Sequence, residues 1–169
     1  EAAARTWPTA FRDERRALKA LERSGGNRRR AVAAVDESSR RFYVSAFQSH
    51  LFNQVVAARL PHGLGTLWDG DLAWLHVSGA CFRVEQAAVE QPRADRFEIS
   101  PTGPLFGFRM TMPEPPAADV ESAVLSACGV ERGDFRSPHL KVKGQRRPLR
   151  FQPEEASLAA GSDELGPFI

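Results

Sequence analysis

Four uncharged polar side chains are spaced so that they could act together on one predicted helix, which covers residues 42–60. Ser45, Ser49 and Asn53 recur every four residues and therefore stack on one helix face, with Gln48 close to them. A solvated face would normally carry Lys and Glu, whereas this one offers short hydrogen-bonding groups. It suits contact with a backbone, a second domain or a nucleic acid. It also fits a core helix whose polar side chains find their partners inside the protein.

Two carboxylates, Asp69 and Asp71, flank Gly70 and could in principle perform acid–base chemistry or hold a cation. The segment lacks the further oxygen ligands of a calcium loop, so a structural turn is the favoured interpretation. The two cysteines form no Cys-x-x-Cys motif, and the four histidines are scattered without metal-ligand spacing. We therefore expect no metal site.

The distribution of basic residues is more informative than the net charge of +2, which follows from 23 Lys plus Arg against 21 Asp plus Glu. Nearly all are Arg, which suits bidentate contact with phosphate, and they gather at residues 28–30, 40–41 and 141–150. Pro148 predicts an edge strand or a bulge for the last cluster. Basic residues there either bind an RNA backbone or protect the edge from aggregation. The predicted RNA contacts are Lys141, Lys143, Arg146, Arg147 and Arg150, with Arg40 and Arg41 as second contacts.

Helical patterns precede Pro61 in the chain. Asp36 or Ser38 can cap the helix over residues 42–60, and Pro61 with Gly63 ends it. Shorter helices are predicted over residues 9–23 and 28–35, the second of them capped by Asn27. The predicted inward stripe of the long helix is Val44, Phe47, Leu51, Val55 and Ala58.

Strand patterns follow Pro61. Residues 72–77 and 80–84 are predicted to form a hairpin with a two-residue turn, Ser78-Gly79. A strand over residues 97–100 is predicted to enter a rigid turn at Pro101-Thr-Gly-Pro104, and a helix is predicted over 118–127. The predicted fold class is α+β, with N-terminal helices packed on a mainly antiparallel sheet and one further helix. The predicted division is a helical segment at 1–62, an α+β part at 63–153 and an acidic, sparse tail at 154–169.

Three stretches resemble motifs of one family, the TruD family of tRNA pseudouridine synthases. Residues 43–53 contain the Ser-Ala-x-x-Ser-x-Leu-Phe-Asn pattern of that family's helix. Residues 99–107 resemble its Ser-Pro-Thr-Gly-Pro loop, and residues 144–150 its Gly-x-Arg-Arg-Pro segment. The three occur in the family's order and spread across most of the chain, which makes the resemblance specific.

The resemblance implies an enzyme that isomerises a uridine of tRNA to pseudouridine, at position thirteen in bacterial members, without cofactor or metal. The base is flipped into a pocket, and an aspartate in a Gly-x-Lys-Asp motif carries the chemistry. This sequence contains no Gly-x-Lys-Asp, so we expect a middle portion of the enzyme, its insertion domain plus the preceding helix, inactive by itself. The residues expected to support the active site are Ser45, Gln48, Ser49, Phe52, Asn53, Ser100, Thr102 and Gly103.

The expected partners are tRNA and the rest of the catalytic domain. No apolar run approaches the ~20 residues of a membrane span and no signal peptide is visible, so a cytoplasmic location without membrane contact is expected. The alternative to an enzyme fragment is a stand-alone, non-catalytic RNA-binding module. An unrelated hydrolase using Asp69 and Asp71 would need a pocket around both carboxylates.

Overall fold

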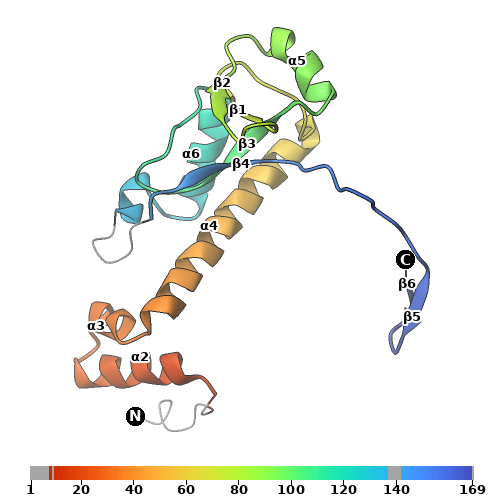
Figure 1. Ribbon diagram of the computed structural model, residues 1–169. Coiled ribbons are helices and arrows are strands. Elements are labelled where there is room, and N and C mark those ends of the chain that lie inside the picture. The colour runs from red at the N-terminus through yellow and green to blue at the C-terminus, as the bar shows by residue number, and fades with distance from the viewer. Residues whose placement is uncertain (1–7, 9, 137–141, 169) are drawn as a thin grey trace.

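The computed structural model describes residues 8, 10–136 and 142–168, which form an α+β fold as predicted (Figure 1). Three helices come first, and the following four strands form an antiparallel sheet of order β2-β1-β3-β4. The helices are α2 (Arg12–Arg23), α3 (Arg28–Ala33), α4 (Glu37–Arg59), η1 (Leu60–His62), α5 (Ala87–Asp95), α6 (Ala117–Ala127) and η2 (Arg132–Phe135). The strands are β1 (Leu72–Leu75), β2 (Cys81–Arg83), β3 (Ile99–Leu105), β4 (Gln145–Pro148), β5 (Gly161–Asp163) and β6 (Gly166–Phe168).

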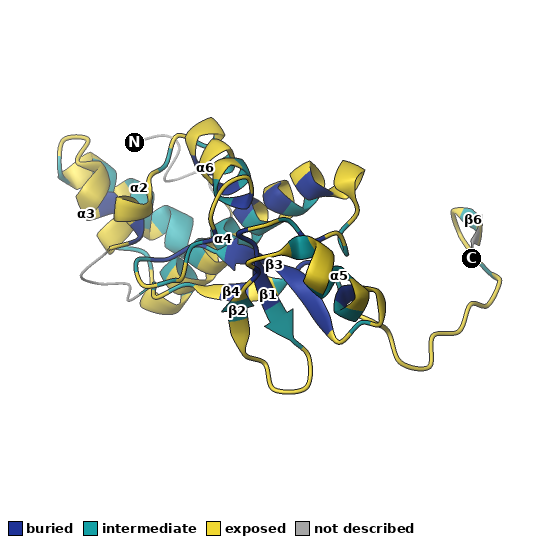
Figure 2. Ribbon diagram, turned by 90° about the horizontal axis from the view of Figure 1, so that it is seen from above, coloured by how far each residue is buried: buried dark blue, intermediate teal, exposed yellow. Residues whose placement is uncertain are grey.

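Helix α4 connects the N-terminal helices α2 and α3 to the sheet (Figure 1). Asp36 caps it by accepting a hydrogen bond from the Ser38 backbone N–H at 2.9 Å, and Asn27 caps α3 through the Arg30 N–H at 3.1 Å, both as predicted. The C-terminal half of α4 packs against β3, whereas its N-terminal half extends away from the sheet and carries α2 and α3 (Figure 1). Helix α2 therefore contains no buried residue, and α3 buries only Ala31 (Figure 2).

The inward stripe of α4 differs from the prediction at its C-terminal end. Leu51 and Val55 are buried as expected, but Ala58 is exposed and Arg59 takes the next inward position with 2% exposure. A charged side chain is buried there because Asp71 supplies a paired carboxylate, 12 residues away in the sequence.

The prediction of a rigid turn at Pro101–Pro104 is wrong, because these residues form the middle of strand β3. The register explains how a central strand contains Pro104. β3 pairs with β1 up to Pro101 and with β4 from Thr102 onward. The Leu149 N–H donates to the Pro101 carbonyl, so by the antiparallel alternation the nitrogen of Pro104 points away from β4. On that side the ladder with β1 has already ended, and no N–H is required.

The predicted two-residue turn between β1 and β2 is also wrong. The loop spans residues 76–79, with the Leu75 N–H donating to the Ala80 carbonyl at 2.8 Å and the Gly79 N–H donating back to Leu75 at 2.8 Å. Gly79 has φ +72°, which is why a glycine suits the last loop position. Helix α5, which contains Pro92, is an additional element that the sequence patterns did not indicate.

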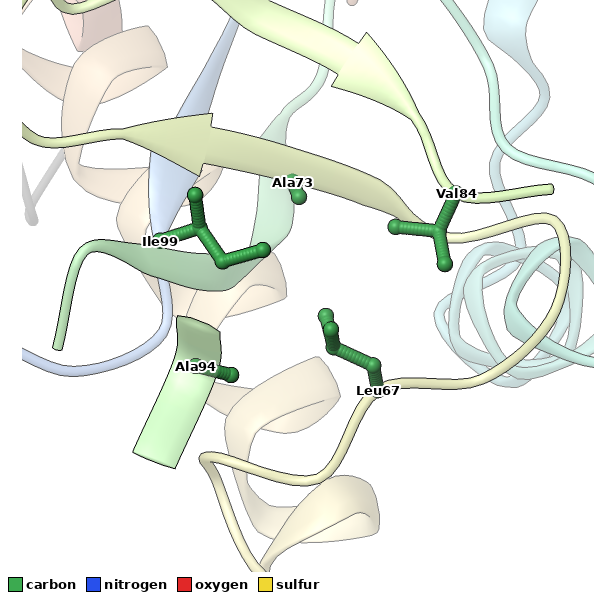
Figure 3. Close-up of a cluster of buried hydrophobic side chains, with 5 residues drawn as sticks. All are labelled: Leu67, Ala73, Val84, Ala94 and Ile99. Carbon is green, nitrogen blue, oxygen red and sulfur yellow. The ribbon is translucent and has the colours of Figure 1, made fainter. Parts of the chain in front are cut away.

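Two apolar clusters hold the sheet and the helices together. Leu67, Ala73, Val84, Ala94 and Ile99 pack between strands β1 and β3 and helix α5 (Figure 3). The second cluster joins α4 to α6 and η2 through Leu51, Phe106, Leu125 and Phe135. The first cluster thus holds α5 against the sheet, and the second holds α4 against α6 and η2.

The C-terminal segment forms an extended arm that ends in the β5–β6 hairpin, apart from the sheet (Figure 1). This hairpin was not predicted. Residues 151–160 are exposed throughout (Figure 2). Among the described residues, none of the helices has the length and apolar character needed to cross a membrane.

Candidate nucleic-acid interface

The basic segment is held beside β3 by a close crossing of two glycines. Backbone bonds run from the Phe108 N–H to the Val142 carbonyl at 3.0 Å and from the Arg109 N–H to the Lys143 carbonyl at 2.9 Å. A Cβ on Gly144 would lie 2.6 Å from the Gly107 nitrogen, and Gly144 has φ +78°. Both features require glycine at Gly144. The crossing brings Arg109 and Lys143 to the same edge of the sheet.

Arg146 is buried, with 8% exposure, contrary to the surface position expected of an RNA contact. Its guanidinium forms a bidentate ion pair with Glu121 of α6, at 2.7 and 3.0 Å. It also donates to the hydroxyl and the carbonyl of Thr102, at 3.0 and 2.8 Å. Burial raises the pKa of Glu121 above its ordinary value, and the Arg146 guanidinium opposes this rise. Arg146 therefore joins β4, β3 and α6 from inside.

Arg150 is half-buried and belongs to a second internal network. It donates to the Ser100 hydroxyl at 3.0 Å and to the carbonyls of Ala94 and Ile99, and it lies 4.5 Å from the centre of the Phe97 ring. The same Ser100 hydroxyl lies 2.9 Å from Nε2 of His76. Burial, and next the Arg150 charge, lower the pKa of His76.

Lys143 and Arg147 are exposed, as an RNA contact requires, while Lys141 lies outside the described residues. The Arg147 guanidinium sits 5.8 Å from the ring centre of Phe52 on α4. Arg109, which the sequence analysis did not select, is exposed on the same edge, and its guanidinium lies 5.6 Å from the Phe108 ring. Within the described residues, no carboxylate forms an ion pair with Lys143, Arg147 or Arg109.

Arg40 and Arg41 lie far from this edge, in the part of α4 that extends away from the sheet (Figure 1). Arg41 pairs with Glu37 one turn earlier, at 2.6 Å. Arg40 is half-buried, and its Nε has no hydrogen-bond partner within the described residues. The structure does not bring these two arginines together with the β4 cluster.

The polar face of α4 is divided between two environments. Gln48 is satisfied inside the protein, because its Nε2 donates to the Phe106 carbonyl at 2.5 Å. Ser49 is half-buried, and Ser45 and Asn53 are exposed. Gln48 therefore fits the interpretation of a core helix, and Ser45 and Asn53 leave an open surface on the rest of the face.

The three selected residues of β3 serve the packing of the sheet. Ser100 and Thr102 are buried, and the Thr102 hydroxyl donates to the Leu72 carbonyl at 2.6 Å. Gly103 faces α4: a Cβ there would lie 2.9 Å from a ring carbon of Phe52 and 2.9 Å from a methyl of Leu149. Glycine at this position allows α4 to approach the strand closely.

Asp69 and Asp71 occupy a turn, as favoured, and have separate structural roles. The Asp71 carboxylate accepts hydrogen bonds from both terminal nitrogens of Arg59 at 2.9 Å and from the Trp68 backbone N–H at 2.8 Å. Asp69 accepts the N–H of Ala87, the first residue of α5, at 2.7 Å. Within the described residues, no group of three or more His, Cys, Asp or Glu side chains is placed to hold a metal ion.

A family model described as tRNA pseudouridine synthase D (TruD) matches residues 1–166. The chain belongs to the TruD family. The tRNA pseudouridine synthase D of Syntrophotalea carbinolica is 45% identical over 166 residues, which make up 98% of this chain and 41% of that protein. The enzyme of the same name from Geobacter metallireducens is also 45% identical, with the same two coverages, 98% and 41%.

A solved structure shares the fold of this TruD-family chain. The crystal structure of the putative tRNA pseudouridine synthase D (TruD) from Methanosarcina mazei matches with a TM-score of 0.74 at 21% identity, and covers 98% of this chain and 41% of that one. This chain therefore spans about 41% of the length of the curated relatives that it matches.

Proposed function

We propose that this chain is the tRNA-binding portion of a tRNA pseudouridine synthase that isomerises one uridine of tRNA, at position thirteen as in bacterial TruD-like enzymes. The observation that carries the proposal is the group of exposed cations at the β4 edge, Lys143, Arg147 and Arg109, which lack carboxylate partners among the described residues. Unpaired cations on one edge suit a phosphate backbone, since phosphate neutralisation supplies much of the affinity for nucleic acid. Arg40 and Arg41 are proposed as a second contact.

Catalysis is assigned to a part of the enzyme outside these 169 residues, because the sequence contains no Gly-x-Lys-Asp motif. The open part of the α4 polar face, Ser45 and Asn53, is proposed to pack against the catalytic domain near its cleft. In the complete enzyme, Asn53→Ala should therefore lower turnover more than tRNA affinity. We place the reaction in the cytoplasm and assign it neither cofactor nor metal.

Binding of tRNA at increasing salt tests the proposal. The logarithm of the affinity should fall with the logarithm of salt by about 0.7 to 0.9 per phosphate contacted. Replacing Lys143 and Arg147 by Ala should lower this slope by about 1 to 2. The matched control is Arg96→Ala, since Arg96 is also exposed but pairs with Glu98 beside α5. An unchanged slope in the double variant would contradict the assignment of this edge.

Tritium release from labelled tRNA separates the enzyme from the alternative of a non-catalytic RNA-binding module. The 169-residue chain should bind tRNA and release no tritium, while the complete protein should release it. A complete protein that binds tRNA without releasing tritium would instead support the module.

A further inference from the structure

An open hollow of about 540 Å³ lies beside the β4 edge, on the sheet face opposite Phe52. Its walls include Trp74 of β1, Cys81 of β2, the segment Arg109–Thr111 and β4. The register identifies this face: Trp74 pairs with both Cys81 and Ser100, whereas Gly103, three residues further along β3, points toward α4. The volume falls within the range of small-molecule sites, about 300 to 1,000 Å³.

The charged side chains that line the hollow are all positive. Its lining residues include three arginines, Arg109, Arg146 and Arg147, and no Asp or Glu. Arg146 is neutralised by Glu121 from beneath. Arg147 pairs with Gly103, and its guanidinium lies beside Phe52, so its side chain is on the other face of the sheet. Arg109 has no carboxylate partner among the described residues, so its positive charge at the border of the hollow remains available to an anion.

The aromatic wall is held in place by its neighbours. Trp74 is half-buried, and a Cβ on Gly79 would lie 3.3 Å from its Cζ2, so the ring packs directly beneath the backbone of the hairpin loop. A fixed indole beside an unpaired arginine is the combination on which single-stranded nucleic acids stack, with the base on the ring and the phosphate near the cation. An acidic peptide would use the arginine but not the ring.

We propose that this hollow binds one unstacked nucleotide of an RNA, with the base against Trp74 and a flanking phosphate at Arg109. The proposal rests on the proposed function and names the part of the surface that receives an unpaired segment. It is independent of the catalytic pocket, which we place outside this chain.

Tryptophan emission provides the test. A short single-stranded oligoribonucleotide is titrated into the 169-residue chain, and emission and affinity are recorded for the wild type and for Trp74→Leu. The wild type should be quenched on binding. Trp74→Leu should lose most of the quenching and bind roughly 5- to 150-fold more weakly, which corresponds to the loss of one stacked base.

Three further variants separate stacking from charge and from unfolding. Trp74→Phe keeps an aromatic ring and should retain affinity within about 3-fold while losing the quenching, which also covers the case in which Trp74→Leu does not fold. Arg109→Ala should reduce the salt slope by about 0.7 and leave quenching at saturation unchanged. Arg96→Ala should change neither quantity.

The outcomes distinguish this proposal from the function on which it rests. Binding of tRNA and of the oligonucleotide without quenching of Trp74 would overturn the nucleotide site and leave the tRNA-binding role intact. No binding of either RNA would overturn both. Equal quenching by a poly-glutamate peptide would show that the hollow recognises negative charge alone, and would overturn the assignment to a nucleotide.

Discussion

Replacing Arg146 should destabilise the fold strongly, whereas replacing its neighbour Arg147 should not. In Arg146→Ala, four hydrogen bonds to Thr102 and Glu121 disappear, and Glu121 stays buried without its partner. Removing one member of a buried ion pair costs about 3 to 5 kcal/mol. Arg147→Ala removes an exposed side chain and should change the free energy of unfolding by less than about 0.5 kcal/mol.

Urea unfolding followed by circular dichroism measures this difference. With a slope of about 2 kcal/mol per molar urea, the loss corresponds to a midpoint about 1.5 to 2.5 M lower for Arg146→Ala. The double variant Arg146→Met with Glu121→Leu should recover most of the lost stability, because an apolar pair of similar volume replaces a buried ion pair at little cost. Equal midpoints for the two single variants would refute the burial argument.

The pH dependence of Arg146→Ala provides an internal check. Without the Arg146 guanidinium, burial and next the Asp71 charge still raise the pKa of Glu121, and only the smaller effect of Arg59 opposes them. The pKa of Glu121 in the folded state should therefore rise further above that in the unfolded state. A raised carboxyl pKa means that the folded state binds more protons, and stability then falls as pH rises above about 4.3. The defect should therefore be smaller near pH 4 than at pH 7. Adding Glu121→Gln should remove this pH dependence.

Three other changes test separate features of the structure. Asp71→Asn should lower the free energy of unfolding by about 3 to 5 kcal/mol, because it leaves the Arg59 guanidinium without its carboxylate partner. Asp69→Ala loses a single hydrogen bond to the start of α5 and should lower the free energy of unfolding by about 1 kcal/mol. Urea midpoints that fall equally in the two variants would contradict this distinction. Gly103→Ala should lower the free energy of unfolding by about 1 to 3 kcal/mol, because the added methyl overpacks against Phe52. Gly133→Ala should leave it nearly unchanged in the same assay, because the space around a Cβ at Gly133 is open. The lowered pKa of His76 means that the unfolded state binds more protons, so melting temperature should fall as pH drops below about 6.5, and His76→Gln should abolish that fall.

The sequence by itself determined the features that depend on neighbours along the chain. The four-residue spacing and the Asp36 cap predicted α4, and Pro148 correctly predicted an edge position for β4. The α+β class followed from the change of pattern at Pro61. These features obey short-range rules, because helix periodicity and capping involve residues within about four positions of one another.

The tertiary structure decided which polar residues are inside. Arg146 and Arg147 are indistinguishable in the sequence, but successive side chains of a strand point to opposite faces, and which face is covered depends on Glu121, 25 residues away. Arg59 is buried for the same reason, through Asp71. The Pro-Thr-Gly-Pro stretch has the local composition of a turn, but it forms a strand because it pairs with β1 and β4, which are distant in the sequence. Long-range partners, which no local pattern encodes, separated the exposed cations from the structural ones.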